Sequence, residues 1–246
     1  MKKYWVIKLL ILIVIICFSI SCTNQENEKQ SKPNIIYILA DDLGYGELGV
    51  YGQKKIQTPN IDALAANGMM FTQHYSGAPV CAPSRYMLMT GKHAGHARIR
   101  GNDEWASRGK VWDYEKAIND PNLEGQRPVL NSTTTLGEIL QNKGYKKAIV
   151  GKWGLGAPLT EGVPNKNGFD FFYGYICQRQ AHQLYPKHLW KNQEKEWLRN
   201  SIVAPGKDNK LEKGADSLSL DSYQKWEQQD YAPEKMQKEV LNFIGK

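Results

Sequence analysis

The sequence predicts an α/β fold with a mixed, largely parallel sheet flanked by helices. Apolar, β-branched runs typical of buried strands alternate with segments whose apolar residues recur at helical spacing. The 246 residues can bury a substantial core, and one domain is the usual number at this length. The apolar fraction of 41% and the charged fraction of 23% are ordinary for a globular protein, which argues against wholesale disorder.

The first 22 residues indicate an export signal rather than a part of the fold. Two lysines precede a short apolar run that ends in Ser21-Cys22, an order typical of secretory signals. The run is short for a membrane span, which needs about 20 residues. We expect lipid attachment at Cys22, with plain cleavage and an uncleaved anchor as alternatives. Residues 23–33 form a polar tether, so we expect an exported bacterial protein in the periplasm, or a lipoprotein anchored at the outer membrane or cell surface.

The first elements of the fold are a strand, a short helix and a second strand. Residues 34–40 are a continuous apolar, β-branched run, which is typical of a strand buried on both faces. A proline near the start and a glycine just past the end predict a helix over residues 61–67. Residues 68–75 are expected to form the second strand.

A helix and then a helix–strand unit follow. Residues 83–90 are predicted to be helical, with Gly91 as the stop. Residues 135–142 carry leucine and isoleucine at helical spacing, and residues 145–150 return as a strand.

The last part of the chain is polar until its final helix. Residues 191–235 are rich in Lys, Asp, Gln and Asn, which predicts an extended surface insertion. Residues 233–244 place apolar side chains on one helical face. A chain that finishes on such a helix, with no strand after it, has the pattern of an interrupted domain. We therefore expect residues 34–246 to be the N-terminal part of a truncated domain, incomplete at the C-terminus.

Charge and cysteine content argue against a nucleic-acid-binding protein and against a disulfide-rich protein. The formal net charge is +7, but the basic residues are scattered and form no stripe with interleaved aromatics, so nucleic-acid binding is not predicted. Two of the four cysteines fall in the export signal, so there is no disulfide framework. Cys81 and Cys177 could pair in an oxidising compartment. The preferred interpretation of Cys177 is a small buried hydrophobic side chain.

Two adjacent acids follow the first predicted strand directly. In open α/β sheets, ligands bind beyond the carboxyl ends of the strands, where Asp41-Asp42 stand. Neighbouring carboxylates repel one another, and a divalent cation stabilises such a pair. A metal site is one interpretation, and a helix cap or a turn with two solvated acids is the other.

The segment Cys81-Ala82-Pro83-Ser84-Arg85 is more specific. Pro83 suits the first turn of a helix, which places Cys81 just before the helix N-terminus. Free N–H groups and the helix dipole favour an anion there. Arg85 follows Cys81 by four residues, so its guanidinium can fold back over the same spot. From these residues alone, a buried cysteine at an ordinary helix start remains the alternative.

Taken in order, these motifs resemble the type I sulfatases of the alkaline phosphatase-like superfamily. The resemblance runs from residue 34 to the end of the chain, and its most specific part is Cys81-x-Pro83-Ser84-Arg85 followed by Thr90-Gly91. It also includes Asp41-Asp42, Thr58-Pro59-Asn60-Ile61-Asp62, and Gly144-Tyr145 through Gly151-Lys152-Trp153. Residues 177–182 with Tyr185-Pro186 resemble the arylsulfatase A-type enzymes that act on sulfated sugars.

The resemblance implies an alkaline phosphatase-like fold and a sulfuric ester hydrolase that acts on sulfated carbohydrate. A maturation enzyme would oxidise Cys81 to formylglycine, whose hydrated aldehyde supplies the nucleophilic hydroxyl. Asp41 and Asp42, together with the formylglycine, would contact one calcium ion.

The remaining roles follow from the same resemblance. Arg85 would stabilise the formylglycine, Lys152 would neutralise the sulfate, and His182 would protonate the leaving alcohol. Three further residues are expected to contact the sugar, although exposed arginines commonly have no specific partner. These are Arg100, Asn102 and Arg179.

Two departures from the family pattern stand out. Gly154 occupies a position where the family often has a histidine, so a hydrogen bond to the formylglycine is missing or supplied by another group. The family's second acidic pair and second lysine are not found after residue 190, so the chain supplies half of the expected metal site. Two alternatives remain: a phosphonate or phosphate monoester hydrolase with the same signature and, if the truncation is real, a non-catalytic surface-binding lipoprotein.

Overall fold

The computed structural model describes residues 32–206 and 210–245. The chain divides into two compact units, Met1–Ala63 and Leu64–Lys246. The expected export signal and nearly all of the expected tether lie outside the described residues, so both stay predictions. Within the described ranges, no helix combines the length and the apolar character that crossing a bilayer requires.

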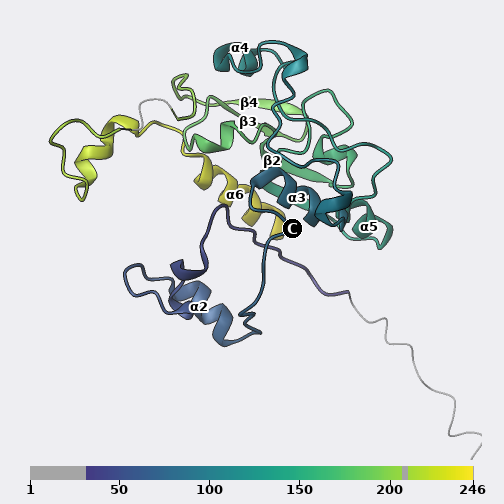
Figure 1. Cartoon of the computed structure of the whole chain (residues 1–246), viewed down its shortest axis with the longest axis horizontal. Helices are drawn as coiled ribbons and strands as arrows, with labels where there is room; N and C mark the ends of the chain where they lie inside the picture. The colour runs from purple at the N-terminus through teal and green to yellow at the C-terminus, as the bar shows by residue number, and fades with distance from the viewer. Residues whose placement is uncertain (1–31, 207–209, 246) are drawn as a thin grey trace, which may run out of the picture. The chain divides into compact units, whose positions relative to one another are not determined.

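The second unit contains the whole sheet (Figure 1). The α-helices are α2 (Pro59–Ala66), α3 (Cys81–Thr90), α4 (Tyr114–Asn119), α5 (Leu136–Asn142) and α6 (Ala232–Ile244). The strands are β1 (Ala148–Lys152), β2 (Phe171–Tyr175), β3 (His188–Lys191) and β4 (Glu194–Trp197). The short 3-10 helices are η1 (Tyr45–Glu47), η2 (Gly49–Tyr51), η3 (Ala94–His96), η4 (Ala106–Arg108), η5 (Pro164–Lys166), η6 (Gln180–His182) and η7 (Leu220–Trp226).

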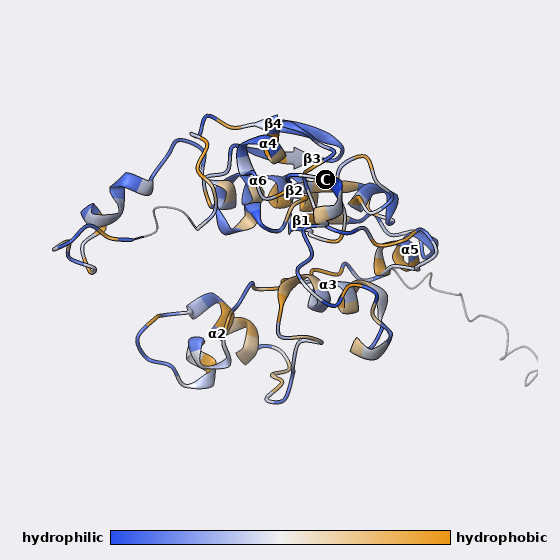
Figure 2. Ribbon diagram, turned by 45° about the horizontal axis from the view of Figure 1, so that its top comes forward, coloured by the Kyte–Doolittle hydropathy of each residue, from blue (hydrophilic) through white to orange (hydrophobic). Residues whose placement is uncertain are grey.

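The sheet is mixed, with the strand order β1-β2-β3-β4. β1 and β2 are parallel, whereas β3 is antiparallel to β2 and β4 is antiparallel to β3. Gly151 of β1 lies opposite Gly174 of β2, and a Cβ on Gly174 would collide with the Gly151 carbonyl. β4 forms the hydrophilic edge of the sheet (Figure 2). The structure confirms the predicted α/β class with a mixed sheet.

Alternating side chains of β2 enter two different cores, as the period of a strand requires. Phe172 and, just after the strand, Ile176 belong to the core that contains side chains of α3. Tyr173 and Tyr175 belong to the core that contains side chains of α6. The sheet is therefore covered on both faces, and β2 is its most buried strand.

Within the first unit, one side chain closes the turn before α2. The backbone N–H of Val50 donates to Asp62 Oδ1 at 2.7 Å, and the Thr58 hydroxyl donates to the same oxygen at 3.1 Å. The Gly49 N–H donates to Thr58 Oγ1 at 2.9 Å. Thr58 and Asp62, which carry part of the family resemblance, thus have a local structural use: they join η2 to the start of α2.

Two predicted strands are wrong. Residues 34–40 and 68–75 form no strand, and their large apolar side chains are exposed, Ile38 at 83% and Met69 at 79%. A β-branched run forms a strand only when a neighbouring strand accepts and donates its backbone hydrogen bonds. Within the described residues neither segment has such a neighbour.

The predicted helices are confirmed, with small shifts at their ends. α2 begins at its proline, and α3 begins at Cys81 rather than after it. α5 starts from a capping box, in which the Thr135 hydroxyl and the Glu138 carboxylate each accept from the other's backbone N–H. The predicted strand 145–150 is shifted and forms β1, and the last helix forms α6.

The expected surface insertion over residues 191–235 is only partly correct. Its beginning completes a β-hairpin, because β3 and β4 are joined by two residues, the first of which, Asn192, has a φ of 55°. The rest holds η7 and the start of α6. The sequence analysis also left β2 and α4 unassigned.

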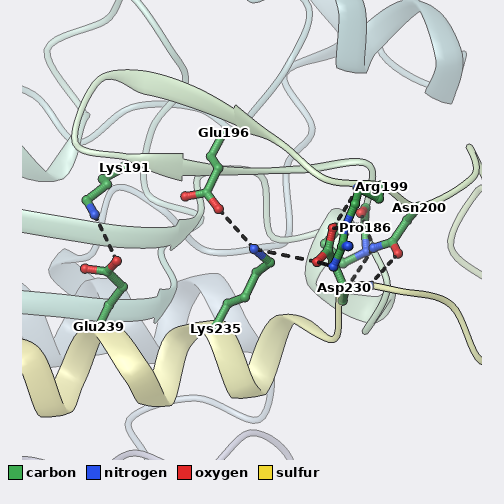
Figure 3. Close-up of polar contacts among 8 residues, drawn as sticks. All are labelled: Pro186, Lys191, Glu196, Arg199, Asn200, Asp230, Lys235 and Glu239. Carbon is green, nitrogen blue, oxygen red and sulfur yellow. Dashed lines mark hydrogen bonds and ion pairs between the residues drawn. The ribbon is translucent and has the colours of Figure 1, made fainter.

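A polar network ties the segment after β4 to the start of α6 (Figure 3). Arg199 donates to Asp230 from its backbone N–H at 2.8 Å and from Nη2 at 2.8 Å. The Asn200 side chain accepts from the Asp230 N–H at 3.0 Å and donates to the Asp230 carbonyl at 2.9 Å. Asp230 is 7% exposed, and hydrogen bonds from Arg199 hold the pKa of its carboxyl well below the usual value.

Two ion pairs continue this network along α6. Lys235 Nζ lies 3.2 Å from Glu196 Oε1, and Lys191 Nζ lies 2.9 Å from Glu239 Oε1 (Figure 3). Both pairs are partly exposed, and such pairs contribute at most about 1 kcal/mol each. Asp230 is therefore the member of the network on which the docking of α6 depends most.

We expect Asp230→Asn to lower the free energy of unfolding by about 2 kcal/mol near neutral pH, the size of a charged hydrogen bond. Because the folded pKa is lowered, the carboxylate stabilises the fold above its unfolded pKa, near 3.8, and this stabilisation is lost as the pH falls. Urea denaturation at several pH values should show the gap between wild type and variant closing in acid. Asp216→Asn is the control, because Asp216 is exposed. A gap that stays constant with pH would contradict the assignment.

Candidate functional site

The N-terminus of α3 holds the most specific part of the sequence. Cys81 is the first residue of the helix and is half-buried, with Val80 as the N-cap. The Ala82 N–H donates to Asn102 Oδ1 at 3.0 Å. Because Asn102 occupies the Ala82 N–H and Pro83 has no N–H, the first turn offers an anion fewer free backbone donors than the sequence analysis expected. Cys81 opens the helix, and Asn102 caps it from outside.

Arg85 lies one turn further along α3 and is 8% exposed. Its Nε donates to the Trp153 carbonyl at 2.7 Å, and its Nη2 donates to Gln178 Oε1 at 2.7 Å. Trp153 follows β1 and Gln178 lies just beyond β2, so the guanidinium joins α3 to the ends of two strands. A buried charge needs such partners, and here they also fix its direction.

The parallel pairing of β1 and β2 sets where the other expected residues lie. The carboxyl ends of parallel strands meet at one edge of a sheet, which is where ligands bind in α/β folds. Lys152 is the last residue of β1 and is half-buried. The segment that contains Arg179 and His182 follows β2 at the same edge. The sheet thus gathers three of the predicted site residues.

His182, Arg179 and Arg100 differ in their surroundings. His182 is exposed at the end of η6. The Arg179 guanidinium stacks over the Trp112 ring, 5.2 Å from its centroid, and Trp112 is 58% exposed. Arg100 is exposed and folds back onto its own backbone, donating to the Ala97 carbonyl at 2.8 Å.

The predicted metal ligands are divided between the two units. Asp41 and Asp42 belong to the first unit, where both are exposed, and Cys81 belongs to the second. Asp42 has a φ of 55°, in the left-handed region that aspartate tolerates better than most residues. Within the described residues the two acids lie in a bend between the extended segment 33–40 and η1, so they do not cap a helix.

A buried acid and thiol lie behind the carboxyl end of β2. Cys177 is free and 5% exposed, which confirms the preferred interpretation of a buried residue. Its Sγ lies 3.7 Å from Glu104 Oε2 and accepts from Gln126 Nε2 at 3.3 Å. Burial raises the pKa of the Cys177 thiol to about 12 and also raises the pKa of the Glu104 carboxyl.

The carboxylate of a second buried acid, Glu124, has basic side chains and an indole N–H as partners. Glu124 Oε1 lies 2.8 Å from both His188 Nε2 and Trp190 Nε1, and Lys195 Nζ lies 3.3 Å from Oε2. Burial alone would raise the pKa of Glu124. The interactions with His188, Lys195 and Trp190 outweigh it and lower the pKa. Glu124 thereby attaches the β3–β4 hairpin to the rest of the second unit.

Sequence reasoning missed Gln126 and Gln178, which support the site. Both are at most 3% exposed, and the Gln178 N–H donates to Gln126 Oε1 at 2.8 Å. Gln178 stands in the motif 177–182, but Gln126 stands in no motif, and the contacts of both join positions that are far apart along the chain.

Comparison with known proteins relates this site to one family. The Sulfatase family profile matches residues 33–236. The chain is 34% identical over 167 residues to human Arylsulfatase D, covering 66% of this chain and 26% of that protein. It is 41% identical over 142 residues to the N-acetylgalactosamine-6-sulfatase of Rattus norvegicus, covering 58% and 25%. The chain therefore spans about a quarter of the length of these relatives.

Solved structures give the same relationship. The crystal structure of Ps i-CgsB matches with a TM-score of 0.58 and 26% identity, covering 87% of this chain and 41% of that one. The same protein in complex with k-i-k-neocarrahexaose matches with a TM-score of 0.57.

We expect Glu104→Gln to flatten the pH dependence of stability. Because the pKa of Glu104 is raised in the fold, its stabilising contribution is complete below the unfolded pKa, near 4.5, and is lost as the pH rises. The variant should therefore become more stable relative to wild type from acid to neutral pH, measured by urea denaturation. Glu115→Gln is the control, because Glu115 is exposed on α4. Parallel profiles for Glu104→Gln and wild type would rule the assignment out.

Proposed function

The chain belongs to the sulfatase family, and we propose that it carries the nucleophile-bearing part of a sulfuric ester hydrolase. One observation carries the proposal. Cys81 opens α3 while Arg85, one turn later, is buried and held in a fixed direction by Trp153 and Gln178. A reactive group at a helix start beside a fixed cation suits an anionic ester.

In this proposal Cys81 is converted to formylglycine by a maturation enzyme. The hydrated aldehyde offers one hydroxyl that attacks sulfur and displaces the alcohol. The second hydroxyl then loses its proton and expels the sulfate, which regenerates the aldehyde, and water hydrates it again. The half-buried position of Cys81 supports this, because the side chain is reachable.

Charge and proton transfer fall to residues at the carboxyl edge of the sheet. Lys152 neutralises a sulfate oxygen, and His182 protonates the departing alkoxide. The parallel pairing of β1 and β2 supports both roles, because it brings the ends of these strands to one edge.

Asp41 and Asp42 are proposed as ligands of calcium. Exposed, adjacent carboxylates are hard oxygen donors, which fits calcium, and their mutual repulsion favours a divalent cation. When bound, calcium would polarise the sulfate as a Lewis acid.

The proposed substrate is sulfated carbohydrate. Two relatives support it by name: an N-acetylgalactosamine-6-sulfatase, and Ps i-CgsB, which was solved with k-i-k-neocarrahexaose. Arg100, Asn102 and Arg179 are proposed to contact the sugar. The stack of Arg179 on the exposed Trp112 supports a role for Arg179. The sequence of residues 1–22 further supports export and anchoring through lipid on Cys22.

We expect Cys81→Ala to lower the turnover of a sulfated oligosaccharide by more than about 10⁴-fold, the usual scale for loss of a nucleophile. Cys177→Ala is the matched control and should retain turnover, because Cys177 is buried and has no proposed role in the reaction. Chromatography of released sulfate is the measurement. Retained turnover in Cys81→Ala would refute the mechanism.

The same assay separates the alternatives. A sulfatase should hydrolyse a sulfate ester faster than the phosphate ester of the same alcohol, and the reverse order would identify a phosphate or phosphonate hydrolase. Binding of the oligosaccharide without turnover, with Cys81 unmodified by mass spectrometry, would identify a surface-binding protein.

Chelation should abolish turnover reversibly. EGTA is expected to remove activity and added calcium to restore it, whereas Asp41→Asn and Asp42→Asn should each need a higher calcium concentration. Calcium should also raise the melting temperature of wild type more than that of either variant. Full activity in EGTA would remove calcium from the proposal.

A further inference from the structure

Position 154 favours glycine over any residue with a side chain. It has a φ of 66°, and a Cβ built there would lie 2.5 Å from Arg85 Nη2 and 2.8 Å from Gln178 Cβ. Its backbone is fixed, because its N–H donates to the Ile176 carbonyl at 3.0 Å. Two side chains from distant parts of the chain thus occupy the space that a side chain at position 154 would need.

One of these side chains, Gln178, is itself held in place. It is 3% exposed, and its N–H donates to Gln126 Oε1 at 2.8 Å. Gln126 is 2% exposed and donates its own N–H to the Gly156 carbonyl at 2.9 Å. The loop after β1, Gln126 and Gln178 therefore form one connected support.

This support holds one edge of the Arg85 guanidinium. Nε and Nη2 lie along one edge of the planar guanidinium, and they donate to Trp153 O and Gln178 Oε1, both at 2.7 Å. Both acceptors are uncharged. They fix the plane of the guanidinium, and neither of them neutralises it as a carboxylate in the same place would.

We propose that Gln178 is a positioning residue for Arg85: it fixes the guanidinium for the reaction at Cys81, and glycine at position 154 leaves it room to do so. The reaction at Cys81 is the proposed function, on which this second half rests. The orientation of Arg85 does not depend on it.

The first experiment measures orientation without turnover. Nitrogen-15 NMR of the protein, labelled in arginine side chains, reports rotation about the Nε–Cζ bond, and the Arg85→Lys spectrum assigns the signals. Wild type should show restricted rotation and separate Nη signals for Arg85. Gln178→Met, similar in size but without an acceptor oxygen, should collapse them.

Two further variants sharpen this test. Gln178→Glu keeps the acceptor, so the separate Arg85 signals should remain. Gln180→Met is the matched control: Gln180 is also 3% exposed, and its side-chain oxygen has no hydrogen-bond partner among the described residues. It should leave the Arg85 signals unchanged. Unchanged Arg85 signals in Gln178→Met would overturn the proposal.

The second experiment measures the consequence for the reaction. Gln178→Met should lower kcat for a sulfated oligosaccharide about tenfold or more, with a smaller change in KM, because orientation matters most in the transition state. Gln178→Glu should also lower kcat, since it neutralises Arg85. In the Arg85→Lys background, Gln178→Met should add little, because it acts through Arg85.

The outcomes separate the two proposals. Suppose that the Arg85 signals collapse in Gln178→Met but the wild-type protein releases no sulfate. This result would support the positioning of Arg85 by Gln178 and refute the proposed function. Collapsed signals with unchanged kcat would overturn the role of Gln178 in the reaction. Equal losses of kcat from Gln178→Met in both Arg85 backgrounds would overturn it as well, since the residue would then act by another route.

Discussion

The parallel pairing of β1 with β2 is the constraint on which the second unit depends. It places the ends of both strands at one edge, so that the Trp153 carbonyl and the Gln178 side chain converge on Arg85. It also lets β2 send alternate side chains into two cores, one shared with α3 and one with α6. The helix that begins with Cys81 is therefore attached to the sheet twice, by apolar packing and by the buried guanidinium. Neither attachment would survive a shift of β2 by one residue, because the shift would exchange the two faces.

The elements that sequence predicts well are those whose cause is local. α5 begins where a capping box can close, and α3 ends where Gly91 adopts a φ of 65°. Strands are different, because a run of residues becomes a strand only when an adjacent strand pairs with its backbone hydrogen-bonding groups. Residues 34–40 have a stronger β pattern than β2, whose Gly174 weakens the signal, yet β2 is a strand because β1 and β3 flank it. The hairpin was missed for a related reason: its turn contains Asn192 but no glycine.

The candidate site divides in the same way. Cys81, Arg85 and Lys152 stand in short motifs, and the family resemblance of these motifs made them candidates. Gln126 stands in no motif, and Gln178 stands in the motif 177–182 with no role assigned to it, while their hydrogen bonds span 52 and 93 residues of sequence. No reasoning about neighbours along the chain reaches such pairs. The sequence did carry one indirect signal, the glycine at position 154, but its meaning depends on which side chains fill the space beside it.

The second unit compensates its buried charges in two different ways, and the difference bears on function. Glu124 is surrounded by His188, Lys195 and an indole N–H, so its charge is balanced inside the protein, as a structural charge requires. Arg85 is held along one edge of its guanidinium by an amide and a carbonyl, and neither of these acceptors carries a charge. A buried cation kept in this way lowers the energy of an anion that arrives beside it. Under the proposed function, the neutral Gln178 beside Arg85 suits an anionic ester better than a carboxylate would, whereas the carboxylate of Glu124 holds the hairpin.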